Sequence, residues 1–148
     1  MKCAKLQTTL PAIILAFFAS VSIADSGVLN ANTAAAEEIS GLPHMDAILA
    51  DVVIKNRPFV TIGELDDLLS SDLDEEQLEE VYGRLFVPIN LNNAKRSDLL
   101  LIPGVGGRMA HEFEEYRPYS NIEQFRREIG KYVDEAEVAR LEQYVTLD

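Results

Sequence analysis

The chain aligns with itself, without gaps, at an offset of sixty residues. Ten positions are then identical, and the apolar positions of the two copies coincide over most of their length. The identical pairs are Asn30/Asn90, Asn32/Asn92, Ala34/Ala94, Pro43/Pro103, Ala50/Ala110, Arg57/Arg117, Pro58/Pro118, Ile62/Ile122, Asp74/Asp134 and Glu75/Glu135. A sequence that repeats at a fixed period predicts repeated supersecondary structure. We therefore expect two copies of one small unit, over residues 25–88 and 89–148.

Each copy is expected to fold as four short helices. In the second copy they span about 94–101 and 107–116, then run from Asn121 to Gly130 and from Asp134 onward. Asn92 or Asn93 would cap the first helix, and the Arg117-Pro118 pair would end the second. Pairs typical of a capping box open the later helices: Thr61/Glu64, Asp74/Gln77, Asn121/Gln124 and Asp134/Glu137. No stretch alternates long enough to predict a strand, so the expected class is all-α.

Residues 1–24 have the pattern of a signal peptide. Lys2 and Lys5 form a basic start, an apolar stretch covers residues 10–19, and small residues at 22–24 suit a cleavage site. The alternative is an uncleaved membrane anchor, but the apolar stretch is shorter than the roughly 20 residues that a spanning helix needs. The pattern predicts an exported protein, periplasmic or secreted, with no membrane span after cleavage.

The charge is strongly negative and unevenly distributed. The chain has 25 acidic and 13 basic side chains, a formal net charge of −12. Residues 25–88 carry three basic and 14 acidic side chains, whereas residues 89–148 carry eight and 11. A protein that coats nucleic acid needs a basic surface, so this composition argues against that class. The two copies are not expected to share one electrostatic role.

Residue types and motifs exclude several kinds of chemistry. One cysteine and two histidines are too few for a disulfide scaffold or a Cys/His zinc site, and His44 and His111 have no third ligand at metal spacing. The acidic run 72–80 lacks the glycine and spacing of a calcium-binding loop. No nucleophile motif, metalloprotease motif or phosphate-binding loop is present. We predict no catalytic residue, no metal and no cofactor.

The segment 102–110, Ile-Pro-Gly-Val-Gly-Gly-Arg-Met-Ala, follows Ile-Asn-Leu-Asn at 89–92. Together they resemble a helix-hairpin-helix unit of the secreted kind found in competence DNA receptors of the ComEA type and, more distantly, in the photosystem II extrinsic subunit U. The resemblance covers nearly the whole chain after residue 24 as two units. It implies sequence-independent binding of double-stranded DNA, in which backbone N–H groups at the start of the second helix contact a phosphate. The matching residues here are Gly104, Val105, Gly106, Gly107 and Arg108.

The first copy departs from this pattern. It has His44-Met45-Asp46 where the family has Gly-x-Gly, so a phosphate would meet side chains and the Asp46 carboxylate. The expected role of residues 25–88 is therefore structural or protein-binding. Two functions remain open for the whole chain: weak DNA binding through the second hairpin, as in the ComEA type, or an exported protein-interaction module with a basic partner, as in subunit U.

Two features of the second copy also have plain structural explanations. The Gly104/Gly106 turn could serve only to join two helices. The basic residues alternate with glutamates, which is typical of a mixed, solvated face; they are Lys95, Arg96, Arg108, Arg126, Arg127 and Lys131. The aromatic residues Phe113, Tyr116, Tyr119 and Phe125 are expected to pack in the core rather than to stack on bases.

Overall fold

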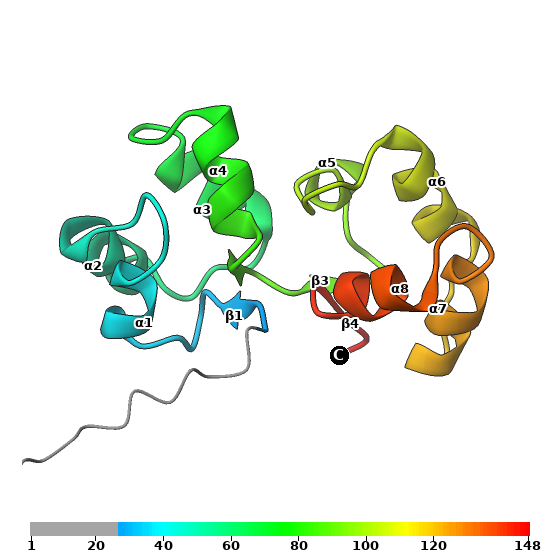
Figure 1. The fold of residues 1–148 in the computed structure, drawn as a ribbon. Helices are drawn as coiled ribbons and strands as arrows, with labels where there is room; N and C mark the ends of the chain where they lie inside the picture. The colour runs from blue at the N-terminus through cyan, green and yellow to red at the C-terminus, as the bar shows by residue number, and fades with distance from the viewer. Residues whose placement is uncertain (1–26) are drawn as a thin grey trace, which may run out of the picture.

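The computed structural model describes residues 27–148, which form eight helices and four two-residue strands (Figure 1). The predicted signal peptide, residues 1–24, lies outside the described residues. The first half contains β1 (Leu29–Asn30), α1 (Ala36–Ser40), α2 (Ala47–Lys55), α3 (Ile62–Leu69), α4 (Glu75–Tyr82) and β2 (Leu85–Phe86). The second half contains β3 (Ile89–Asn90), α5 (Arg96–Leu99), α6 (Gly107–Glu115), α7 (Ile122–Ile129), α8 (Glu135–Glu142) and β4 (Val145–Thr146). The chain is mostly helical, as expected. Across these described residues, no helix is long and apolar enough to cross a membrane.

The expectation of a chain without strands is wrong in detail. β1 pairs in parallel with β2, and β3 pairs in parallel with β4. Each pair joins the beginning of one half to its end, because Leu29 N–H donates to the Arg84 carbonyl at 2.7 Å and Ile89 N–H donates to the Tyr144 carbonyl at 2.8 Å. Two residues are too few to show the alternation by which a strand is recognised. These pairings were therefore invisible in the sequence.

The later helices begin where the capping residues predict. Thr61, Asp74, Asn121 and Asp134 each accept a hydrogen bond from the backbone N–H three residues later. Asp74 and Gln77 form the complete reciprocal pair. The side chain of Gln124 instead accepts from the Ser120 N–H, one residue before the cap. The caps fix the starts of α3, α4, α7 and α8, although the full capping box is not formed at each of them.

The predicted first helix of the second half is too long. α5 covers only Arg96–Leu99. Its N-cap is Lys95, whose side chain makes no capping hydrogen bond. Asn92 does not cap it, because its side chain bridges to Tyr119, accepting from the N–H at 2.7 Å and donating to the carbonyl at 3.0 Å. Asn32 makes the same two bonds to Phe59 in the first half. In each half, the asparagine thus joins the segment before the first helix to the loop after the second helix.

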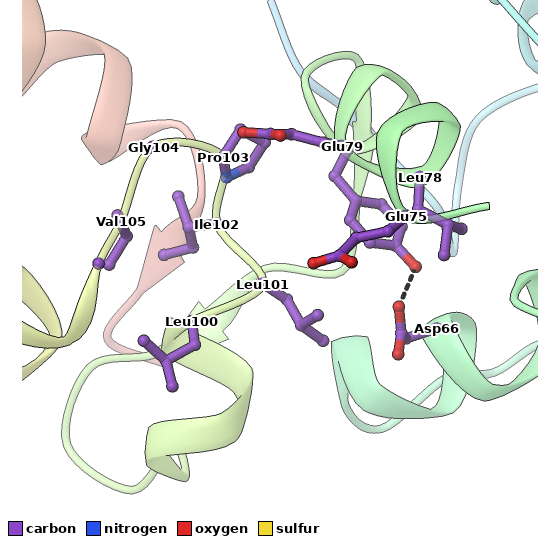
Figure 2. Close-up of a pocket in the computed structure, with 12 residues that line it drawn as sticks. Asp66, Glu75, Leu78, Glu79, Leu100, Leu101, Ile102, Pro103, Gly104 and Val105 are labelled. Carbon is purple, nitrogen blue, oxygen red and sulfur yellow. Dashed lines mark hydrogen bonds between the residues drawn. The ribbon is translucent and has the colours of Figure 1, made fainter.

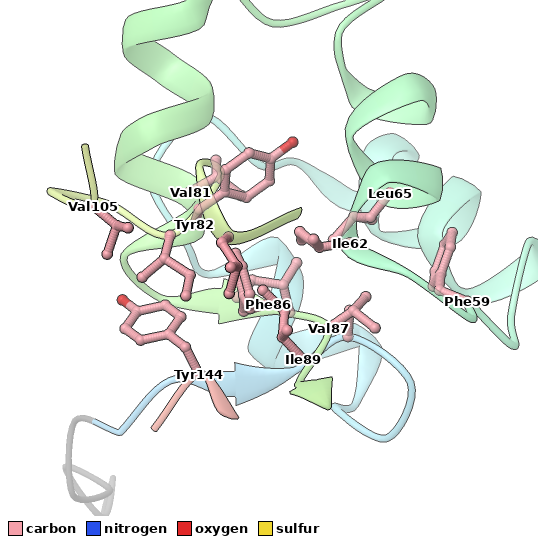
Figure 3. Packing of buried hydrophobic residues seen from close by; sticks show 14 of the residues in the cluster. Phe59, Ile62, Leu65, Val81, Tyr82, Phe86, Val87, Ile89, Val105 and Tyr144 are labelled. Carbon is pink, nitrogen blue, oxygen red and sulfur yellow. The ribbon is translucent and has the colours of Figure 1, made fainter. Parts of the chain in front are cut away.

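A shared apolar core joins the two halves. The ring of Phe86, at the end of the first half, packs edge-on against two tyrosine rings (Figure 3). The ring centroids are 6.0 Å apart for Tyr82 and 4.9 Å apart for Tyr144 of the second half. Val105, from the hairpin of the second half, is also buried in this region. The Val28 N–H adds a hydrogen bond to the Gln143 side chain at 3.0 Å. The hairpin between α5 and α6 is therefore positioned against the first half.

Candidate nucleic-acid interface

The turn between α5 and α6 is held by backbone and side-chain bonds. Gly104 has φ +77°, a left-handed conformation that suits glycine. Val105 follows it, buried, with its N–H donating to the Ile102 carbonyl at 2.9 Å. Arg140 of α8 donates to the Pro103 carbonyl at 2.9 Å. In the first half, His44 adopts the same conformation, with φ 60°. The turn is therefore pre-formed in both halves, and glycine is not required for its shape.

The start of α6 is open. Gly106 is the N-cap, no side chain within residues 27–148 caps the helix there, and a Cβ at Gly106 would meet nothing within 4 Å. The first N–H groups of a helix have no partner within that helix, and its N-terminus carries a partial positive charge. Gly106 and Gly107 are exposed, so an anion can approach this backbone directly. Of the predicted site residues, Gly106, Gly107 and Arg108 lie at this helix start, Gly104 is the left-handed residue of the turn, and Val105 is buried beside it.

The start of α2 is already occupied by a carboxylate of the chain. Asp46 Oδ1 accepts hydrogen bonds from the N–H groups of Ile48 at 2.9 Å and Leu49 at 2.8 Å. The positions sixty residues later are Gly106, Arg108 and Met109. The sequence predicted that Asp46 would repel a phosphate; the structure shows that its carboxylate also takes the N–H groups a phosphate would need. Aspartate is a preferred N-cap residue, so this bond was readable from the sequence but was missed.

Most of the basic residues near the hairpin are paired with glutamates. The pairs are Arg96–Glu114 at 2.6 Å, Arg126–Glu142 at 2.6 Å, Arg127–Glu128 at 3.0 Å and Lys131–Glu128. The hydrogen bonds from Arg126 hold the pKa of Glu142 below its ordinary value. Of the six basic residues considered, Lys95 and Arg108 form no ion pair with any part of the chain that the structure describes. The face is mixed, as expected. Two exposed cations lie at the start of α6: Arg108, and Arg96, which donates to the Gly107 carbonyl at 2.6 Å and is paired with Glu114.

Two hollows border Gly106, and they differ in charge. One, of about 370 Å³, lies between α4 and the hairpin and is lined by carboxylates of α3 and α4 (Figure 2). The other, of about 380 Å³, is lined by Arg108 and Lys131 together with Met109, Tyr132 and the buried carboxylate of Glu112. An anion at the start of α6 is therefore favoured on the Arg108 side and repelled on the α4 side.

The aromatic residues of the second half form core rather than a stacking surface. Phe113, Tyr119 and Phe125 are buried, and the rings of Phe113 and Phe125 meet edge-on at 5.3 Å. Burial raises the pKa of Tyr119 above its ordinary value. Tyr116 is half-buried, and its hydroxyl lies 2.8 Å from that of Tyr132. Three of the four aromatic residues predicted for the core are thus buried, and their rings offer no surface on which a base could stack.

The histidines do not converge on a metal site. His44 Nε2 lies 2.9 Å from a carboxylate oxygen of Glu80, and His111 lies 3.5 Å from Glu115 on the same helix. In the range 27–148, no three side chains among His, Cys, Asp and Glu are grouped so as to hold a metal ion.

Comparisons with family models, with curated proteins and with solved structures each gave no match to this chain.

Proposed function

We propose that this is an exported, non-enzymatic protein of two tandem helix-hairpin-helix units, residues 25–88 and 89–148, preceded by a signal peptide at 1–24. The second unit binds duplex DNA weakly and without sequence preference. Its contact is a backbone phosphate held at the hairpin Gly104–Arg108. The first unit does not bind DNA and supports the second.

The observation that carries this proposal is the difference between the two helix starts. At α2 the chain supplies its own anion, the Asp46 carboxylate, at 2.8 and 2.9 Å from two N–H groups. At α6 the capping residue is a glycine with open space beside it, and an exposed arginine follows two residues later. A phosphate oxygen at α6 would replace the carboxylate found at α2, and Arg108 would add a charge-assisted bond.

The charges predict weak binding. The chain is strongly acidic overall, so a polyanion is attracted only where basic groups such as Arg108 make the local field positive. Sequence-independent DNA binding has dissociation constants of about 10⁻⁴ to 10⁻⁶ M at physiological salt, and one or two phosphate contacts place this protein at the weak end of that range. Phosphate contacts carry no sequence information, so no base preference is expected.

The test is fluorescence anisotropy of a labelled duplex titrated with residues 25–148 at several salt concentrations. Arg108→Gln is compared with Arg84→Gln, which removes an exposed arginine of the first half that forms no ion pair within 27–148. We expect Arg108→Gln to weaken binding and to reduce the slope of log K against log salt by about 0.9, the value of one lost phosphate contact. Arg84→Gln is expected to change neither quantity. Equal effects of the two variants would contradict the proposal.

A further inference from the structure

The cleft between α4 and the hairpin is formed by both halves of the molecule. Its walls are Asp66, Glu75, Leu78, Glu79 and Tyr82 on the first half and residues 100–106 on the second, around a volume of about 370 Å³. Figure 2 shows the carboxylates of Glu75 and Glu79 pointing toward the loop that contains Leu101 and Pro103. The cleft exists only because the two halves pack together. It shares the turn at Gly104–Gly106 with the proposed phosphate site but lies on the α4 side of it, away from Arg108.

The polar side chains that line the cleft all come from α3 and α4, and the charged ones all have the same sign. None of the residues that line it is basic. The Asp66 carboxylate accepts a hydrogen bond from the Tyr82 hydroxyl at 2.7 Å, so one acid is already partly engaged. Glu75 and Glu79 are exposed and form no ion pair with the described chain. Two free carboxylates one helical turn apart present a surface that matches a basic segment.

The opposite wall supplies an apolar contact that the hairpin itself does not require. Leu100 is 45% exposed, and Leu101 beside it is half-buried. Sixty residues earlier, the corresponding turn of the first half has Ser40 and Gly41. A turn of this shape thus forms without leucines. The second half places two of them beside the cleft, opposite the free carboxylates of α4.

We propose that this cleft binds a basic peptide segment of a partner protein. Lysine or arginine side chains of the peptide lie on Glu75 and Glu79, and one apolar side chain packs against Leu100 and Leu101. Sites for small ligands run from about 300 to 1,000 Å³, and the cleft, at about 370 Å³, is near the lower end of that range. It therefore suits one or two side chains rather than a whole helix. A polyanion is repelled from the same cleft, which separates this site from the phosphate site on the Arg108 side.

The experiment uses a fluorescein-labelled dodecapeptide of Lys and Arg with two adjacent Leu at its centre, titrated with the protein in an anisotropy assay. Two control peptides are used: one with Leu replaced by Ser, and one with the basic residues replaced by Glu. Glu75→Lys/Glu79→Lys is compared with Asp72→Lys/Glu76→Lys, which makes the same change in net charge on exposed positions that do not line the cleft. Circular dichroism checks that both variants fold.

We expect Glu75→Lys/Glu79→Lys to weaken binding of the Leu peptide by about tenfold, because each reversed charge at an exposed contact weakens binding by a few-fold. The control pair is expected to change it by less than about twofold. Leu100→Ser, at an exposed position, is expected to weaken binding of the Leu peptide but not binding of the Ser peptide. Equal effects of the two charge pairs, equal binding of the Leu and Ser peptides, or no binding of the Leu peptide would each overturn the proposal. The peptide assays are carried out without DNA. A negative result in them therefore leaves the DNA-binding proposal unaffected, and the reverse is also true.

Discussion

Gly106→Asp should stabilise the fold by giving α6 the cap that α2 already has. The Gly106 backbone, at φ −88° and ψ 176°, resembles that of Asp46 at φ −119° and ψ −178°. A Cβ at Gly106 meets nothing within 4 Å, so the new side chain fits without rearrangement. Its carboxylate would reach the N–H groups of Arg108 and Met109, as Asp46 reaches those of Ile48 and Leu49.

The size of the effect follows from the two contributions that this carboxylate makes. Aspartate is better than glycine at an N-cap by a few tenths of a kcal/mol. A negative charge beside a helix N-terminus contributes about 0.3–1 kcal/mol, and the two contributions overlap. We therefore expect Gly106→Asp to raise the free energy of unfolding by about 0.5–1 kcal/mol, or the melting temperature by about 2–4 °C.

Urea unfolding followed by circular dichroism measures this change, with Gly106→Ala as the matched control. Alanine adds the Cβ without the carboxylate and is a poorer cap than glycine, so it should lower stability by a few tenths of a kcal/mol. The expected order is therefore Asp above Gly above Ala. If Gly106→Asp is less stable than the unmodified protein, the start of α6 is not the open anion site described here.

Three further predictions concern the start of α2, the Arg117 side chain and the pH dependence of stability. Asp46→Gly/Ile48→Arg opens the start of α2 and adds a cation there; it should strengthen duplex binding at low salt in the anisotropy assay and steepen its salt dependence, and no gain would show that the two helix starts are not equivalent. Arg117→Lys should lower the free energy of unfolding by about 1–3 kcal/mol in urea titrations, because lysine lacks the planar fork through which Arg117 Nε and Nη2 donate to the Leu91 and Ala94 carbonyls. A change near zero would contradict this prediction. Since Arg126 lowers the pKa of Glu142, this pair stabilises the fold above the ordinary glutamate pKa of about 4.3, and its contribution is lost as the pH falls through the lower folded value. Arg126→Gln should therefore flatten the fall of the urea midpoint below about pH 5, whereas an unchanged profile would refute the assignment.

The sequence predicted those parts of the fold that depend on neighbouring residues. The second helix was expected over about 107–116 and is observed as Gly107–Glu115. The capping residues Asn121 and Asp134 mark helix starts correctly, because a cap is a bond across three residues. In α6, Ala110 and Phe113 are buried, so this helix packs its apolar residues against the core.

Features that depend on distant residues were not predicted. Asn92 or Asn93 was expected to cap the first helix of the second half, but the N-cap is Lys95, and the Asn92 side chain bonds to Tyr119, 27 residues away. The strand pairs join residues 56 apart, such as Leu29 and Leu85, through too few residues to leave a pattern. The pairing of Arg126 with Glu142 likewise depends on the packing of α7 against α8. The candidate site was located by its glycines, but its charge balance required the structure.

The proposed DNA binding depends on a phosphate held at the open start of α6. The most direct measurement is duplex anisotropy on the unmodified protein and Gly106→Asp side by side, at low salt and at about 0.15 M salt. We expect salt-sensitive binding by the unmodified protein and a loss of at least roughly tenfold in Gly106→Asp, because the new carboxylate occupies the N–H groups of a helix that is folded and more stable. Equal binding by the two proteins, or no binding by the unmodified protein at low salt, would contradict it.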